Sequence, residues 1–147
     1  MDDVLKLLTF LVACGLAFIA YQQFQIARAK LKIDLFEKRI AVFNATRQML
    51  GAMVSDGPGE LEKVYEFRAA VAAAPFLFDD DVIAYLEEID SRAVDLRAIV
   101  KRIEKPSTNG DRDSLIDKEA AVQIWFKNQL LEITAKFMPY LGLHTWR

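Results

Sequence analysis

The sequence has few residues that interrupt helices and few that carry catalysis or bind metals. Its 147 residues include 4 Pro, 6 Gly, one Cys and one His. Because Gly and Pro are the residues that break helices, their scarcity predicts long uninterrupted helices and argues against a disordered chain. The single cysteine, Cys14, excludes an intramolecular disulfide and fits a reducing compartment.

Recognisable chemistry is equally scarce. His144 is the only histidine, so the paired Glu-x-x-His motifs of di-metal bundles and the usual zinc spacings are absent. No glycine-rich phosphate loop is present. Acidic residues cluster at 79–81 and 87–88, where helix capping and a solvated face explain them more simply than catalysis. We therefore expect no catalytic residue, cofactor or metal, and no small-molecule substrate is evident.

Charge also limits the class of partner. The formal net charge is −2, which argues against a nucleic-acid-binding protein. Residues 25–54 carry an excess of positive charge, with six basic and two acidic residues. We expect five of these basic residues to contact anionic lipid and to set the membrane topology, namely Arg28, Lys30, Lys32, Lys38 and Arg39.

The most informative feature is a long apolar run near the N-terminus. No charged residue occurs from Leu7 to Ala27, and a helix of about 20 apolar residues spans the roughly 30 Å of a bilayer core. We expect residues 1–24 to form a transmembrane anchor. Because positive residues stay on the cytoplasmic side, the N-terminus is expected outside and the rest in the cytoplasm.

A cleaved signal peptide is not expected, because it would need a basic start and a small-residue cleavage site, whereas the chain starts Met1-Asp2-Asp3. Two alternatives to a permanent anchor stay open. The segment Leu11–Cys14 is similar to a bacterial lipobox, which would make Cys14 a lipidated residue. An apolar helix of this length is also found in the core of some soluble proteins.

The remainder of the chain is expected to be an antiparallel bundle of about four helices. Apolar residues recur at spacings of three, four and seven, and no segment alternates apolar and polar residues as strands do. The expected helices cover residues 25–54, 60–74, 79–105 and 114–138. This order would bring His144 and Trp146 close to the bilayer surface.

Two sets of residues are candidates for contacts between proteins. Thr9, Ala13 and Ala17 recur every fourth residue of the anchor, and small residues of this kind let membrane helices approach closely. The second set is an apolar face on the helix after the anchor. This candidate interaction face consists of Leu35, Phe36, Val42 and Phe43.

A family resemblance supports the membrane assignment. The runs QIARAKLKIDLFEKRIAVFNATRQML and EFRAAVAAAPFLFDDDVIAYLEEID resemble small bacterial membrane proteins in which a transmembrane helix leads into an "LDLFEKR…VF.AT" helix. The chain has Ile33 where that pattern has Leu. The resemblance covers residues 20 to 95 and implies a bacterial inner membrane. It implies no activity and carries over no catalytic residue.

We therefore expect a single-pass, membrane-anchored helical module that acts by interaction or as a scaffold. It would be a homo-oligomer or an accessory subunit of a larger inner-membrane complex, with lipid and a protein as its partners. The first alternative is a membrane-acting effector or channel-like oligomer of a stress or defence system. The second is an enzyme that depends on carboxylates and a metal.

Overall fold

The protein is helical throughout the part that the structure describes. The computed structural model describes residues 1–55, 57, 61–105 and 109–142, which contain four α-helices, one short 3₁₀ turn and no strand. The expected all-α fold is confirmed. The chain divides into an N-terminal unit, Met1–Glu37, and a C-terminal unit, Lys38–Arg147. Residues 143–147, and with them His144 and Trp146, lie outside the described part.

The N-terminal unit consists of the first part of helix α1. This helix runs from Asp2 to Ser55, as expected for a stretch without Pro in which the sole glycine before Gly51 is Gly15. Asp2 and Asp3 occupy the first turn, where carboxylates favour the positive end of the helix dipole. Every residue from Met1 to Asp34 is exposed, including the whole apolar run.

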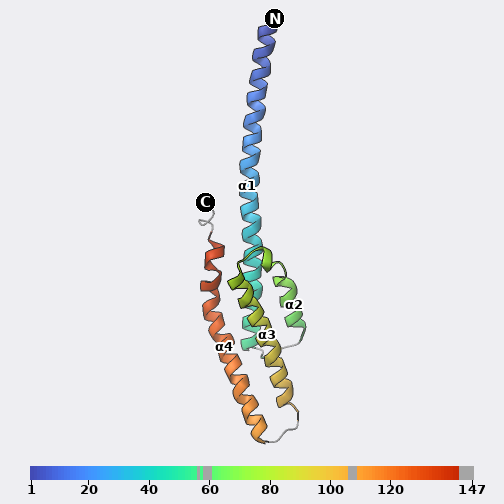
Figure 1. The fold of residues 1–147 in the computed structure, drawn as a ribbon, viewed down its shortest axis with the longest axis vertical. Coiled ribbons are helices and arrows are strands. Elements are labelled where there is room, and N and C mark those ends of the chain that lie inside the picture. The colour runs from blue at the N-terminus through green and yellow to red at the C-terminus, as the bar shows by residue number, and fades with distance from the viewer. Residues whose placement is uncertain (56, 58–60, 106–108, 143–147) are drawn as a thin grey trace. The chain divides into compact units, whose positions relative to one another are not determined.

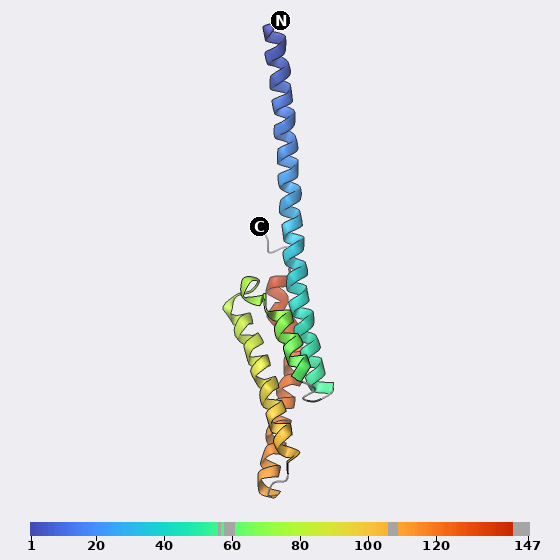
Figure 2. The same ribbon diagram turned by 90° about the vertical axis from the view of Figure 1, so that its right-hand side faces the viewer.

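The C-terminal unit is an antiparallel bundle. It contains the end of α1, then α2 (Leu61–Val71), the 3₁₀ turn η1 (Ala74–Phe76), α3 (Asp80–Ile103) and α4 (Asn109–Leu141). Within this unit each helix runs opposite to the one before it (Figures 1 and 2). Helices α3 and α4 pack against each other and form a hairpin that extends past the end of α1 and the start of α2 (Figure 1).

Three helix ends, one in α2 and two in α4, differ from the expected ones by three residues or more. Helix α2 stops at Val71 rather than near residue 74. Pro75 has no N–H to continue the helical hydrogen bonds, and it lies inside the 3₁₀ turn η1 that follows. Helix α4 begins at Asn109, five residues before the expected start, with Asp111 in its first turn. It also continues through Pro139 to Leu141, since a proline in the last turn removes just one hydrogen bond.

All four helices contribute to one core in the C-terminal unit. Leu50 of α1, Phe67 of α2, Ile89 of α3 and Phe126 of α4 are between 0% and 4% exposed. Thr46, also fully buried, donates its hydroxyl to the carbonyl oxygen of Val42 at 2.8 Å. The apolar stripes that predicted the helices therefore face one another in the structure.

Charged side chains connect neighbouring helices around this core. Arg68 of α2 donates two hydrogen bonds to the Asp90 carboxylate of α3, at 2.7 and 2.8 Å. The guanidinium of Arg92 on α3 lies 4.4 Å from the ring centre of Trp125 on α4, within cation–π range. Arg92 is also held by Glu88, one turn earlier, at 2.8 Å.

Candidate functional site

The small residues of the proposed anchor lie on one exposed face of α1. Thr9, Ala13 and Ala17 are all exposed, and their spacing of four residues places them on adjacent turns. The Thr9 hydroxyl donates to the carbonyl oxygen of Leu5 at 2.8 Å. This bond pairs the hydroxyl with its own helix, so Thr9 presents mainly its methyl group to a neighbour.

The basic residues after the apolar run do not share one environment. Arg28, Lys30 and Lys32 are exposed in the N-terminal unit, and Arg28 lies 5.7 Å from the ring centre of Phe24. Lys38 is exposed at the start of the C-terminal unit. Arg39 is different, because it is half-buried and packs into the bundle.

Arg39 is the centre of an aromatic cluster at the end of the bundle where Lys38 begins the unit. It donates from Nε to the carbonyl oxygen of Leu77 at 3.0 Å and from Nη1 to that of Tyr140 at 3.1 Å. Its guanidinium lies 6.0 Å from the Phe78 ring centre and 5.8 Å from that of Tyr140. Burial lowers the pKa of Arg39, and the nearby Asp79 opposes this effect.

The same cluster links three segments through ring contacts. Phe78 meets both Phe137 and Tyr140 edge-on at 5.3 Å, and Phe43 meets Phe137 at 5.5 Å. We call Arg39, Phe43, Phe78, Phe137 and Tyr140 the Arg39 cluster. It connects residues 39–43 of α1, the η1–α3 connection and the end of α4 to one another, so Arg39 serves the fold as well as contributing a positive charge.

Tyr140 also forms hydrogen bonds to two residues of the acidic cluster 79–81, which was considered as a catalytic site. Its hydroxyl bonds to Asp79 at 3.1 Å and to Asp81 at 2.9 Å. Asp79 occupies the N-cap position of α3, but its side chain makes no capping bond. Burial, followed by the bonds to Asp81 and Asp79, raises the pKa of Tyr140 to about 12. These carboxylates therefore have a structural role at the start of α3.

The candidate interaction face is divided by the structure. Leu35 and Phe36 belong to the N-terminal unit, whereas Val42 and Phe43 belong to the C-terminal unit. Val42 is 2% exposed, so its side chain packs in the core of the bundle and is not available to a partner. Phe43 is half-buried against Phe137. The apolar spacing that suggested an open face therefore arises in part because Val42 and Phe43 pack inside the bundle.

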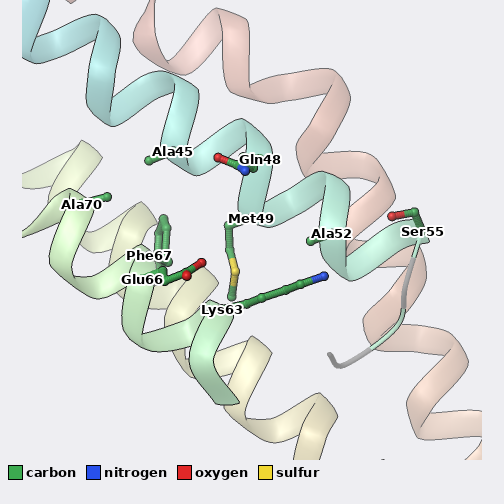
Figure 3. A pocket seen from close by; sticks show the side chains of 9 residues that line it. All are labelled: Ala45, Gln48, Met49, Ala52, Ser55, Lys63, Glu66, Phe67 and Ala70. Atoms are coloured by element: carbon green, nitrogen blue, oxygen red, sulfur yellow. The ribbon is translucent and has the colours of Figure 1, made fainter. Parts of the chain in front are cut away.

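A groove runs between the end of α1 and α2. Its volume is about 440 Å³, and Figure 3 shows Met49 and Lys63 pointing into the space between the two helices. Small side chains create this space, namely those of Ala45, Ala52 and Ala70. Ser55, at the end of the groove, donates to the carbonyl oxygen of Gly51 at 3.0 Å.

Helix α4 carries an exposed apolar stripe that was not predicted from the sequence. Ile124, Leu131 and Met138 are 60%, 78% and 64% exposed and recur every seven residues. They lie opposite the core stripe that contains Phe126 and Ile133. We call these three residues the α4 outer stripe. The seven-residue spacing was the available signal, but the stronger core stripe of the same helix concealed it.

The acidic residues do not assemble into a metal site in the part of the chain that the structure describes. No three His, Cys, Asp or Glu side chains among those residues lie together in a way that would hold an ion. Glu88 pairs with Arg92 at 2.8 Å, and Asp90 pairs with Arg68.

No protein-family model, curated protein sequence or solved structure matches this chain. The features with the greatest bearing on function are the exposed apolar part of α1 and the apolar surfaces of the bundle.

Proposed function

We propose that this protein is a single-pass membrane protein whose C-terminal helical bundle acts by protein–protein interaction on the cytoplasmic side of a bacterial inner membrane. The observation that carries the proposal is an 18-residue window of α1 that is apolar enough to cross a membrane and has none of its residues buried. A core helix of a soluble protein would bury most of such a window. Lipid is the environment that removes this surface from water.

The residues that flank the window support the orientation. Arg28, Lys30 and Lys32 follow the apolar run directly, and such residues favour the cytoplasmic side. At that membrane surface they also attract anionic lipid, by about 1 kcal/mol for each cation. The resemblance of residues 20–95 to small bacterial membrane proteins supports the inner membrane as the location.

The bundle supports a role in interaction because it displays apolar surface that its own core does not use. On α4 this surface is the α4 outer stripe, in which Leu131 is 78% exposed. Apolar patches on the surface of a protein are typical of interaction sites. We propose this stripe, rather than the face containing Val42, as the bundle's docking surface for the larger complex.

Cysteine labelling tests the anchor and its orientation together. The chain has one cysteine, so a Cys14→Ala background accepts single reporters at Asp2→Cys and Ser91→Cys, both at exposed positions. A membrane-impermeant maleimide applied to cells with a permeabilised outer membrane should label the reporter at position 2. The reporter at position 91 should react with the maleimide only after the cells have been lysed. Labelling of position 91 in unlysed cells would refute the cytoplasmic placement.

A second experiment tests the docking surface. Leu131→Ser should leave the unfolding midpoint of the bundle unchanged, because Leu131 is 78% exposed. It should also reduce the mass of the complex purified in mild detergent. Tyr65→Ser is the matched control, since Tyr65 is 57% exposed on α2. An unchanged complex with Leu131→Ser, or equal loss with both variants, would contradict the assignment.

A further inference from the structure

The exposed part of α1 carries a seven-residue repeat of large aliphatic side chains. Taking these as position a of a heptad, the residues are Leu5, Val12, Ile19, Ile26 and Ile33. They are 61%, 56%, 53%, 66% and 54% exposed, in that order. The repeat covers four heptad intervals, and its last two members, Ile26 and Ile33, follow the expected anchor of residues 1–24. The apolar composition of a membrane span does not account for these two.

We propose that this repeat is the seam of a parallel coiled coil between two copies of the chain, a proposal that rests on the membrane anchoring proposed above. Apolar residues at position a keep that face of a helix toward its partner, and in parallel coiled coils Val or Ile at position a combined with Leu at position d favours two strands. Copies anchored in one membrane with one orientation also meet in parallel. The occupant of this face is therefore a second copy of the same chain.

The charges beside the seam are complementary in this arrangement. In a parallel pair, position g of one helix faces position e of the next heptad in the other helix. Lys32 takes position g and Glu37 takes position e, so each copy offers Lys32 to Glu37 of the other. Lys32 also has an interaction within its own chain, and its three N–H donors allow a second partner. The preceding pair joins Gln25 with Lys30, so no like charges meet.

Two residues at position d, Gly15 and Ala29, are small enough for two helices to approach closely. The full set at position d is Leu8, Gly15, Gln22, Ala29 and Phe36. A Cβ atom added at Gly15 would meet nothing within 4 Å, so the fold of a single chain does not require glycine there. A partner helix does have a use for it, because small residues at a seam allow membrane helices to approach closely.

This seam differs from the face formed by Thr9, Ala13 and Ala17. Those residues take positions e, b and f of the same heptads, so they lie beside or away from the a/d side of the helix. Within lipid, burial of apolar surface gives no driving force for association. Ile26 and Ile33 follow the proposed span, where burial against a partner is favourable. The two faces therefore make different predictions about which residues touch across copies.

Disulfide cross-linking in native membranes distinguishes the faces. On the full-length Cys14→Ala background, one cysteine is introduced at a time as Ile26→Cys, Ile33→Cys, Leu31→Cys or Ala13→Cys. Leu31 is the matched control, because it lies between the seam positions, takes position f and is 60% exposed. Oxidation with copper phenanthroline should give a dimer several-fold more abundant at positions 26 and 33 than at 31 or 13. Equal yields at 31, or the highest yield at 13, would overturn the proposal.

Charge exchange tests the parallel register. In the Ile26→Cys reporter, whose thiol is remote from both charges along the chain, Lys32→Glu should lower the dimer yield several-fold, and adding Glu37→Lys should restore it. A yield that the second change does not restore would contradict the pairing. The same membranes are extracted with alkaline carbonate. Protein that stays in the membrane without seam cross-links refutes the coiled coil alone, whereas protein that is released refutes the anchoring.

Discussion

Arg39 offers the sharpest test of how the bundle is held together. Replacing it by Met keeps most of the side-chain volume and removes the donors to the carbonyl oxygens of Leu77 and Tyr140. Hydrogen bonds from charged groups contribute about 1.5–3 kcal/mol each. Arg39 is half-buried, so the low end of this range applies to each bond. Met also avoids the free-energy cost of dehydrating a guanidinium, which offsets part of the loss. We expect Arg39→Met to reduce the free energy of unfolding by about 2 kcal/mol.

Tryptophan fluorescence in detergent micelles measures this change. The chain has two tryptophans, so a Trp146→Phe background leaves Trp125, between α3 and α4, as the reporter. With a urea dependence of about 1–3 kcal/mol per molar, the unfolding midpoint should fall by about 1 M. The unfolding midpoint of Arg39→Lys should lie between those of the wild type and Arg39→Met, since the lysine ammonium keeps the charge but lacks the planar fork of donors.

Arg47 provides the matched control, because it is exposed on the same helix two turns further along. Arg47→Met should change the free energy of unfolding by less than about 0.5 kcal/mol. If Arg39→Met destabilises the bundle no more than Arg47→Met does, the fastening role is refuted. A loss of binding to anionic vesicles with no change in the unfolding midpoint would instead assign Arg39 to lipid alone.

Three further predictions concern the bundle. Phe126→Ala should cost about 3–5 kcal/mol in urea unfolding because Phe126 is 0% exposed, whereas Phe76→Ala, at 87% exposed, should cost less than about 0.5 kcal/mol; equal costs would refute the core assignment. Since the pKa of Tyr140 is raised to about 12 from an unfolded value of about 10, its protonated form contributes stability below pH 10 that disappears as the pH rises toward 12. Tyr140→Phe should flatten the fall in unfolding free energy across that window, and an unchanged slope would count against the raised pKa. Arg68→Asp should lower the unfolding midpoint by breaking the pair with Asp90, and adding Asp90→Arg should restore it; no restoration would mean that the pair contributes nothing.

The apolar periodicity was sufficient to predict the helices and much of the core. Leu50, Ile89 and Phe126 follow stripes with helical spacing and are all 0% exposed. Burial of one helix face produces this spacing directly, so the pattern can be read without knowing which helices meet. The same local signal does not predict where α4 begins and ends, because Gly110 lies in its first turn and Pro139 in its last, where a helix breaker costs few helical hydrogen bonds.

The partners of the polar side chains could not be predicted for a different reason. Arg39 reaches carbonyl oxygens 38 and 101 residues away, and every residue type has such an oxygen, so the sequence contains no signal for the pairing. The α4 outer stripe was hidden because one helix carries two apolar faces. The heptad of α1 was hidden in its first half because almost any position of a membrane span is apolar.

Alkaline carbonate extraction of native membranes tests the central claim most directly. The full-length chain is followed by its intact mass, so that retention and cleavage are read in one experiment. The account predicts that the uncleaved protein stays with the lipid after peripheral proteins have been released. Release of the intact chain into the soluble fraction, or a shortened product that has lost the apolar start of α1, would contradict it.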